Sequence, residues 1–595
     1  MWYWKFAFIC LLWYSKVTVS HADGSLNKDD EPPRVFFLIF GGLAIAGILR
    51  ALIKILNIPI PFRVFILFVG GIIGILTKAS TYIAKYTQIV YLPPRYMLMS
   101  CLPLLMFKSA FCIDAHTFMR SWGQIFFLAV PGILINAFFT GMIMMVLLNH
   151  DDWTYAMGLM FGTICSPIYP IEVVSLLKEI GQAKHLSILL EGEGMIGDGS
   201  VMIMFEILLG VIEEDITTWY HVVMVFSRFA LGGIALGLVL GKLMGWIMAV
   251  MYSDVVNMLI FTMVAAYLTY YIGTEMLSVS GVIAVVVLGI MISMEKTSLS
   301  IDTEIFLMHF WDMLAYMANT MVFLLAGIII TKKLSQSAGI QDYALVLITY
   351  VVAGVGRLLE YILLAPIVSR IGYGLTFRNM TIAVWGGIRG PVPFCLTLSV
   401  FHHSGLSPLG RELLVHIAGL VTLTLLINAT TMPLLLRLLG LSELSMARKV
   451  NMNNCMRHLE NRRDRTISML KMDRFLADAN WPLVNTATIL KHPYKINYSD
   501  SDEEEENYLG FRVTTCPDCQ KEIPNEPTNK EMVEMIREAR MRILKAKKIS
   551  YARQYENGML SKEGIRVLTQ AIETAMDTPE ALIELEGLHR YFKRQ

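Results

Sequence analysis

The sequence predicts an all-α membrane protein with about thirteen transmembrane helices, inverted repeats, two broken crossing helices and a helical cytosolic tail. Hydrophobic residues make up 55% of the 595 residues and charged residues only 17%, which is typical of a polytopic membrane protein. Apolar segments of about 20 residues, the length that crosses a bilayer, recur between residues 35 and 439. Glycine and proline interrupt two of these segments at similar positions in the two halves of the chain.

The beginning of the chain predicts a signal peptide, and the charge, the cysteines and the missing motifs exclude several classes of protein. Residues 1–22 are predicted to be a signal peptide, because Lys5 precedes a short apolar core that is followed by small residues. A net charge of +1 gives no basic excess for nucleic acid, and eight scattered cysteines indicate no disulfide framework. Signatures of hydrolases, P-loops and zinc enzymes are missing, so we expect neither an enzyme nor a cofactor or metal site.

Thirteen apolar segments are candidate membrane spans. They cover residues 35–56, 60–77, 89–112, 122–148, 154–178, 186–210, 219–251, 255–274, 276–293, 305–330, 342–369, 378–401 and 411–439. An odd number of spans places the two ends of the chain on opposite sides of the membrane. Basic residues closely follow the last span, which predicts a cytoplasmic C-terminus and an external N-terminus, as a signal peptide requires.

The fifth and twelfth segments contain helix breakers. These are Gly162–Pro170, with Pro167 and Pro170, and Gly386–Pro393, with Gly390 and Pro391. Proline removes a backbone donor and clashes with the preceding turn, so both helices should open within the membrane. Opened backbone is tolerated there only where it lines a cavity or is buried in protein. Two broken helices at matching positions favour an inverted-repeat transporter over simple proline kinks.

Three carboxylates, Glu191, Glu193 and Asp198, lie within the apolar segment 186–210. An acidic side chain at the centre of a membrane helix costs about 2.5–3.5 kcal/mol on insertion scales, so it marks a site for a cation or a proton by default. Glu191 and Glu193 could instead lie near the membrane–water interface and extend their carboxylates to water. Asp198 lies deeper. The G-x-G-x-x-G pattern in this stretch is not a dinucleotide site, because no strand precedes it.

From residue 440 the composition becomes polar, and residues 440–595 are predicted to form a cytosolic tail. Its acidic run, Ser499–Glu506, is typical of a solvated linker. Cys516 and Cys519 form a single C-x-x-C, for which two free thiols are favoured over half of a zinc site. Lys530–Gln554 is predicted to be an amphipathic helix in a small helical region, which is suited to binding a partner or the membrane face.

Several of these stretches, in this order, resemble the sodium/proton exchanger family of monovalent cation:proton antiporters. The resemblance is carried by Pro170–Leu186, Glu191–Ser200, His309–Phe323 and Trp385–Gly390, and it is strongest for the long-tailed branch of sperm-type and plant plasma-membrane exchangers. It implies an antiporter domain over residues 35–439. It also implies a multi-pass protein that forms a homodimer, in the plasma membrane rather than in an organelle.

In that family, an aspartate preceded by an asparagine binds the ion and exchanges protons. The resemblance assigns this role to Asp198, with Gly197 in place of the asparagine, and it matches Glu193 to a glutamate of the same motif. The unwound Thr-Asp-Pro of the family is replaced by Ile-Tyr-Pro, so Tyr169 offers an oxygen without a charge. Glu172 follows on the same helix face, where it either restores a carboxylate to the cavity or lies at the interface.

The resemblance further implies that Arg357 and Arg389 balance charges at the broken helices. It implies a secondary active antiporter that exchanges protons for a monovalent cation, with sodium expected, and so regulates intracellular pH and sodium. Its partners are then that cation, protons, the bilayer and a second copy of the chain, with no nucleic acid. Competition at a single carboxylate suffices for one-for-one, electroneutral exchange.

Two alternatives remain open at this point. The missing threonine, aspartate and asparagine remove much of the shell of oxygen ligands that sodium needs. They favour a transport-deficient exchanger-like subunit that acts as a regulator or scaffold through its tail. A channel-like leak is the other alternative, and it would give current without proton coupling.

Overall fold

The structure of the chain is a computed structural model. It describes residues 31–56, 61–79, 94–148, 153–180, 184–213, 218–250, 254–296, 299–334, 340–403, 407–441, 446–473, 475–476, 479–490, 513–515, 522–524 and 529–577. The predicted signal peptide, the acidic run Ser499–Glu506, and Cys516 and Cys519 lie outside these residues. The chain divides into two compact units, Met1–Leu441 and Ser442–Gln595.

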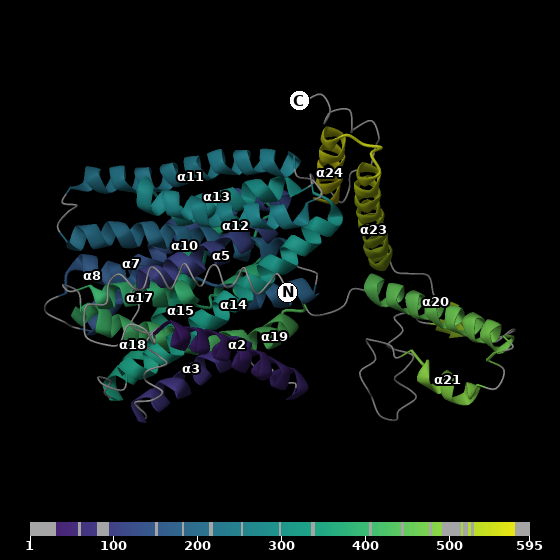
Figure 1. Cartoon of the computed structure of the whole chain (residues 1–595), viewed down its shortest axis with the longest axis horizontal. Helices are drawn as coiled ribbons and strands as arrows, with labels where there is room; N and C mark the ends of the chain where they lie inside the picture. The colour runs from purple at the N-terminus through teal and green to yellow at the C-terminus, as the bar shows by residue number, and fades with distance from the viewer. Residues whose placement is uncertain are drawn as a thin grey trace. The chain divides into compact units, whose positions relative to one another are not determined.

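The first unit consists of helices that mostly lie alongside one another (Figure 1). They are α2 (Glu31–Leu56), α3 (Phe62–Ala79), α5 (Pro94–Cys112), α6 (Ala115–Phe127), η2 (Leu128–Gly132), α7 (Ile133–Leu148), α8 (Tyr155–Cys165), α9 (Ile171–Ile180), α10 (Lys184–Ile212), α11 (Trp219–Val250), α12 (Val255–Tyr271), η3 (Ile272–Met276), α13 (Gly281–Met294), α14 (Ile301–Leu334), α15 (Ile340–Val368), α16 (Phe377–Trp385), α17 (Pro391–His402), α18 (Ser407–Leu423), η5 (Thr424–Asn428) and α19 (Ala429–Leu438).

Each of the thirteen apolar segments contains helix where the structure describes it. Within the described residues, eight helical stretches are long and apolar enough to cross a membrane, and shorter apolar helices accompany them. The prediction of a helical membrane protein is therefore confirmed at this level. The π-helical turn η2 contains Pro131 and lets the chain continue from α6 into α7 without a break.

Glycines allow several of these helices to pack with their backbones close together. On α11, a methyl group at Gly237 would lie 2.6 Å from the carbonyl oxygen of Ala284 on α13, and one at Gly233 would lie 2.8 Å from that of Ser280. On α3, a methyl group at Gly74 would lie 2.9 Å from the carbonyl oxygen of Ile328 on α14. Small residues at such crossings are the usual means of helix association in lipid.

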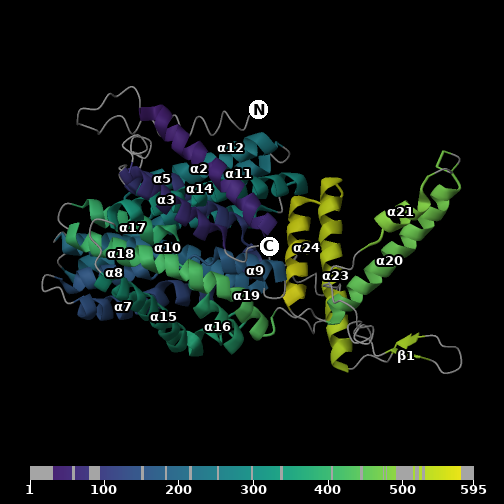
Figure 2. The same cartoon turned by 90° about the horizontal axis from the view of Figure 1, so that it is seen from below.

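The outer face of α11 is apolar and exposed, with Met224 and Trp246 among its most exposed side chains. Such a face is suited to lipid rather than water. In contrast, α7, α8 and α15 lie side by side in both views (Figures 1 and 2), and their facing side chains form part of the buried core. Polar groups inside this core need partners from neighbouring helices.

The second unit contains α20 (Met446–Lys471), α21 (Trp481–Ala487), β1 (Val513–Thr515), β2 (Glu522–Pro524), α23 (Asn529–Glu556) and α24 (Lys562–Asp577). The all-helical prediction missed the hairpin, in which β1 and β2 pair antiparallel with Thr514 opposite Ile523. Figure 2 labels β1 within this unit. The strands are only three residues long and flank the C-x-x-C motif, so period-two alternation gave no signal for them.

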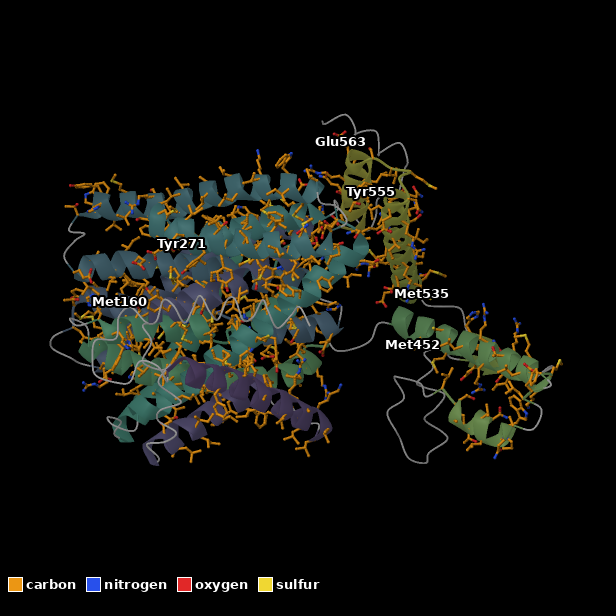
Figure 3. The ribbon with its side chains drawn as sticks, in the orientation of Figure 1. Met160, Tyr271, Met452, Met535, Tyr555 and Glu563 are labelled. Atoms are coloured by element: carbon orange, nitrogen blue, oxygen red, sulfur yellow. The ribbon has the colours of Figure 1, made fainter. Side chains whose placement is uncertain are left out.

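Helices α23 and α24 pack against each other through buried side chains that include Leu544 and Ile572. An ion pair between Lys548 and Glu573, with 2.7 Å between nitrogen and oxygen, joins them at the surface. Figure 3 labels Met535 and Tyr555 towards opposite ends of α23. The apolar stripe of α23 formed by Met532, Met535, Ile536, Ala539 and Ile543 is largely exposed, whereas Leu544 is buried. Helical periodicity indicated the helix but not the face that packs.

Candidate ion-binding site

Two interrupted helices meet inside the first unit. Helix α8 ends at Cys165 and α9 begins at Ile171, while α16 ends at Trp385 and α17 begins at Pro391. The two gaps are directly joined, because the backbone N–H of Tyr169 donates a hydrogen bond to the carbonyl oxygen of Ile388 across 2.7 Å. We call these gaps, residues 166–170 and 386–390, the first and second break.

Glycine is required where the two breaks touch. A Cβ atom at Gly390 would lie 2.5 Å from the Cβ of Tyr169, which is closer than real side chains approach. Prolines start the helices that follow, since Pro170 precedes α9 and Pro391 occupies the first turn of α17. Proline suits this position, because its missing N–H would have had no helical partner.

The helix ends at the breaks leave backbone groups that must be satisfied within the protein. The guanidinium of Arg389 donates through Nη1 to the carbonyl oxygens of Ser166 and Pro167, the latter at 3.1 Å. Its positive charge therefore lies at the C-terminal end of α8, where the helix dipole is negative. At the end of α16, Nδ2 of Asn428 donates to the carbonyl oxygen of Trp385 across 3.0 Å.

Asp198 lies on the face of α10 that contacts the first break. Gly194 is one turn earlier on that face, and a methyl group there would lie 2.9 Å from Cδ of Pro170 and 3.1 Å from the carbonyl oxygen of Ile168. Asp198 is buried and lies within Coulombic range of the Tyr169 hydroxyl. Among the described residues, its carboxylate has neither a hydrogen bond nor an ion pair.

Tyr169 presents an oxygen beside this carboxylate. Its hydroxyl donates to Oδ1 of Asn319 on α14 across 2.8 Å, and the guanidinium of Arg63 lies 5.3 Å from the centre of its ring. Because the hydroxyl proton is used on Asn319, the lone pairs of the oxygen remain available as acceptors. Asn319 lies within the motif 309–323, but nothing local in the sequence indicated its contact with Tyr169.

Glu172 is held by a partner of its own. Nη1 of Arg63 lies 2.6 Å from Oε1 of Glu172, at the start of α9, and both side chains are partly exposed. The charge of Glu172 is therefore balanced by Arg63. Glu172 follows Tyr169 by three residues on the chain, but its ion pair is with Arg63 of α3 and not with a group on α10.

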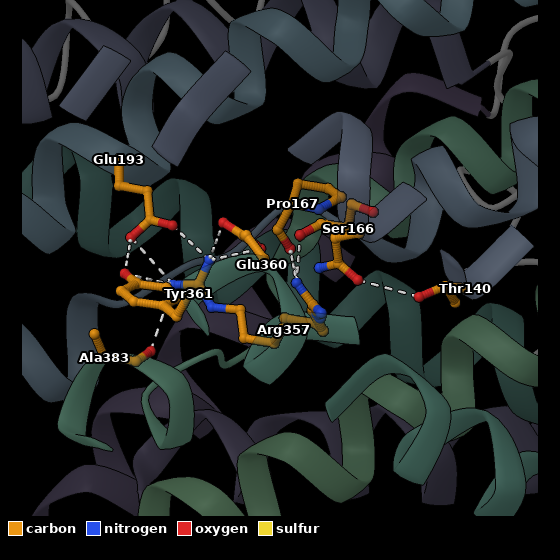
Figure 4. Close-up of polar contacts among 10 residues, drawn as sticks. Thr140, Ser166, Pro167, Glu193, Arg357, Glu360, Tyr361 and Ala383 are labelled. Atoms are coloured by element: carbon orange, nitrogen blue, oxygen red, sulfur yellow. Dashed lines mark hydrogen bonds and ion pairs between the residues drawn. The ribbon is translucent and has the colours of Figure 1, made fainter. Parts of the chain in front are cut away.

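Glu193 belongs to a buried ionic network (Figure 4). Its two carboxylate oxygens accept from Nη1 and Nη2 of Arg357 at 2.5 and 3.1 Å, and its Oε2 also accepts from the Tyr361 hydroxyl at 2.8 Å. Arg357 also contacts Glu360 at 3.3 Å and donates to the carbonyl oxygen of Ala383 at 3.4 Å. This network joins α10 to α15 and to α16. The side chains of Arg357, Glu193 and Glu360 are each at most 2% exposed.

The sequence reasoning identified Glu193 and Arg357 but missed Glu360 and Tyr361. A signal was present, since Glu360 lies three residues after Arg357 in an apolar span, the spacing of neighbours on one helix face. A bidentate arginine–carboxylate pair of this kind is strong and directional. It fixes α10 relative to α15, and it uses both oxygens of Glu193.

These contacts distinguish Asp198 from Glu172, Glu191 and Glu193. Glu191 pairs with Lys178 at 3.0 Å, while Glu172 and Glu193 pair with arginines. A buried carboxylate without a counter-charge is costly unless a proton or a cation neutralises it. The arrangement can therefore bind either a proton or a monovalent cation at Asp198.

Known proteins are similar to this chain over the residues that contain both breaks. The family model described as "Sodium/hydrogen exchanger, transmembrane" matches residues 39–438. The chain is 28% identical over 585 residues to sodium/hydrogen exchanger 7 of Arabidopsis thaliana, which covers 94% of this chain and 48% of that protein. It is 26% identical to solute carrier family 9 member C1 of Mus musculus, over 92% of this chain and 46% of that protein.

The chain thus spans about half the length of these two relatives. Among solved structures, the sodium proton antiporter MjNhaP1 from Methanocaldococcus jannaschii at pH 8 matches with a TM-score of 0.58 and 19% identity. The match covers 69% of this chain and all of the archaeal chain. At this level of identity, the likeness establishes a shared fold.

Proposed function

Because this chain belongs to the sodium/hydrogen exchanger family, we propose that it is a secondary active antiporter that exchanges protons for a monovalent cation. Sodium is the expected cation, and the exchange regulates intracellular pH and sodium. One observation carries the proposal: Asp198 is buried against the first break and has no counter-charge among the described residues. In this proposal the antiporter domain spans residues 35–439, and residues 440–595 form the tail.

Exchange follows from competition at one carboxylate. Asp198 binds the cation only when it is ionised, and protonation removes the charge that attracts the cation. A site with one uncompensated carboxylate therefore carries either one proton or one monovalent cation, which makes the exchange one-for-one and electroneutral. The ion pairs of Glu172 with Arg63 and of Glu193 with Arg357 support this stoichiometry, because each of these carboxylates already has a cationic partner.

Neutral oxygens complete the proposed site. Hard cations prefer oxygen ligands, and the hydroxyl of Tyr169 retains lone pairs after donating to Asn319. The carbonyl oxygen of Ile168 faces Gly194 on the same side of α10 as Asp198. We propose that these two oxygens replace part of the shell that the family's threonine, aspartate and asparagine provide.

Alternating access in this proposal uses the broken helices. The breaks lie in the fifth and twelfth of thirteen membrane crossings, in two halves related as inverted repeats, with the C-terminus in the cytoplasm. Helices with interrupted backbone near the bilayer midplane let one bundle rock around a fixed site. We further propose that the protein acts as a homodimer in the plasma membrane.

One observation still favours the alternative, a transport-deficient regulatory subunit. Gly197 and Tyr169 stand where the family has an asparagine and an aspartate. Antiport is better supported, because a buried aspartate without a role is costly to retain. Purified protein in proteoliposomes separates the two. An outward-directed or inward-directed sodium gradient should move protons, and the flux should persist when valinomycin and potassium clamp the membrane potential at zero. Absence of sodium-driven flux would favour the regulatory subunit, and current without proton coupling would favour a leak.

A further inference from the structure

A second carboxylate lies on the same face of α10 as Asp198. Glu191 precedes Asp198 by seven residues, which is two helical turns or about 10 Å along the axis. The side chain of Glu191 is only 8% exposed. Its Oε2 lies 3.0 Å from Nζ of Lys178 on α9, and the side chain of Lys178 is 53% exposed. A buried carboxylate is thus covered by a lysine whose flexible stem reaches towards the surface.

Other lysines lie near this pair. Lys108, near the end of α5, forms an ion pair of 3.1 Å with Asp312 on α14. Lys108 and Lys296 both lie within Coulombic range of Glu191. Burial lowers the pKa of the Lys296 ammonium, although acidic groups beside it oppose that shift. Glu191 thus lies within reach of three lysine ammonium groups, of which Lys178 is the one in direct contact with its carboxylate.

The helix ends that carry these groups lie together. Oγ of Ser293, near the end of α13, donates to the carbonyl oxygen of Ile113, just after α5, across 2.8 Å. Lys184, at the start of α10, pairs with Asp114, which caps α6. Glu191 is therefore near the end of the bundle at which α10 begins, while Asp198 lies two turns deeper on the same helix face.

We propose that Lys178 is a built-in competitor for the transported cation at this end of the bundle. Its ammonium occupies Glu191, the carboxylate that precedes Asp198 on this face of α10, and an entering cation has to displace it. Both the ammonium and a monovalent metal ion carry one positive charge and bind carboxylate oxygen, so they exclude each other electrostatically. This inference rests on the proposed function, and it assigns Lys178 the role of raising the cation concentration at which transport begins.

The exposure of Lys178 makes displacement inexpensive. A partly exposed ion pair contributes little, because water solvates the lysine when it swings away. The opposite holds for Arg357, whose buried pair with Glu193 has no such exit. Lys178 is therefore the exchangeable partner and Arg357 the fixed one.

The test compares the KM for sodium of full-length variants in proteoliposomes. We expect Lys178→Gln to lower the KM by roughly twofold to fivefold, as a partly exposed ion pair permits, with little change in maximal rate. Glu191→Gln should raise the KM, and in that background Lys178→Gln should have no further effect. Lys184→Gln is the matched control, because it removes another largely exposed lysine at the same end of α10, and it should leave the KM unchanged.

A KM that Lys178→Gln leaves unchanged or raises would overturn the inference, as would an equal decrease in the Glu191→Gln background. A merely structural pair between α9 and α10 would instead lower the thermal midpoint and the maximal rate at constant KM. If the wild type shows no sodium-driven flux, the proposed function fails. The sodium dependence of the thermal midpoint then tests the inference separately: Lys178→Gln should shift its half-saturation to lower sodium only when Glu191 is present.

Discussion

The backbone N–H of Tyr169 donates to the carbonyl oxygen of Ile388, and this bond joins the two interrupted helices of the first unit. At the point where the breaks meet, Gly390 also packs against the Cβ of Tyr169. The tyrosine hydroxyl continues to Asn319 on α14. Tyr169 thus links both breaks to α14 near the carboxylate of Asp198. The position of Tyr169 depends on the absence of a side chain at Gly390.

Gly390→Ala tests this contact. The added methyl would lie 2.5 Å from the Cβ of Tyr169, and the backbone fixes the position of each Cβ atom, so the breaks have to separate. We expect sodium-driven proton flux to fall on the order of tenfold or more, since shifts of about 1 Å can cost such factors at a functional site. Gly354→Ala is the control, because no atom lies within 4 Å of its added methyl. Equal flux from both variants would show that the contact does not position the site.

Tyr169→Phe tests the proposed oxygen ligand. The ring remains against Gly390 and under Arg63, while the hydroxyl and its bond to Asn319 are lost. We expect the KM for sodium to rise by about twofold to tenfold, the range of one lost polar interaction. Tyr267→Phe removes a hydroxyl that donates to the carbonyl oxygen of Ser100 at the same distance, 2.8 Å, and should leave the KM as it is. A rise in KM for both would indicate a general packing effect.

The two helix breaks could be predicted from the sequence, because the prolines that cause them act locally. Pro167, Pro170 and Pro391 act through their own rings and missing N–H groups, so no distant partner had to be known. The depth of Asp198 likewise followed from the length of the apolar run around it. These signals located the candidate site.

The partners at the site could not be predicted in this way. Glu172 is paired with Arg63 and Tyr169 with Asn319, and each partner comes from a helix far away in the sequence. The sequence left open whether Glu172 restores a carboxylate, because spacing along one helix does not tell which neighbouring helix approaches it. Glu360 differs from these residues, because its spacing of three residues from Arg357 is a local signal, although it belongs to none of the motifs that carry the resemblance.

Arg357→Met tests the buried network. It leaves Glu193 in the core without its cation, and breaking a buried pair in this way costs about 3–5 kcal/mol. We expect a markedly lower thermal midpoint in detergent, and partial recovery in the double variant Arg357→Met/Glu193→Gln, which removes one of the two buried carboxylates that Arg357 contacts. Arg228→Met, at an exposed arginine on α11 that donates to the carbonyl oxygen of Ser278, should change the midpoint little. No recovery in the double variant would argue against charge compensation as the role of Arg357.

Competition between protons and sodium at Asp198 predicts a specific dependence on pH. As the pH on the sodium side falls, more of the carboxylate carries a proton, so the apparent KM for sodium should rise while the maximal rate at saturating sodium stays constant. Initial rates at several pH values on that side of the proteoliposome measure both quantities. A maximal rate that falls with pH at constant KM would indicate separate sites for the two ions.

Asp198→Asn tests the central claim most directly, because it keeps the size of the side chain and removes its charge. Sodium-driven proton flux is measured in proteoliposomes with matched amounts of folded protein, against Glu206→Gln, which removes an exposed carboxylate from the same helix. We expect Asp198→Asn to reduce the flux to that of protein-free vesicles and Glu206→Gln to retain it. Wild-type flux from Asp198→Asn would contradict the assignment of this aspartate as the exchanging site.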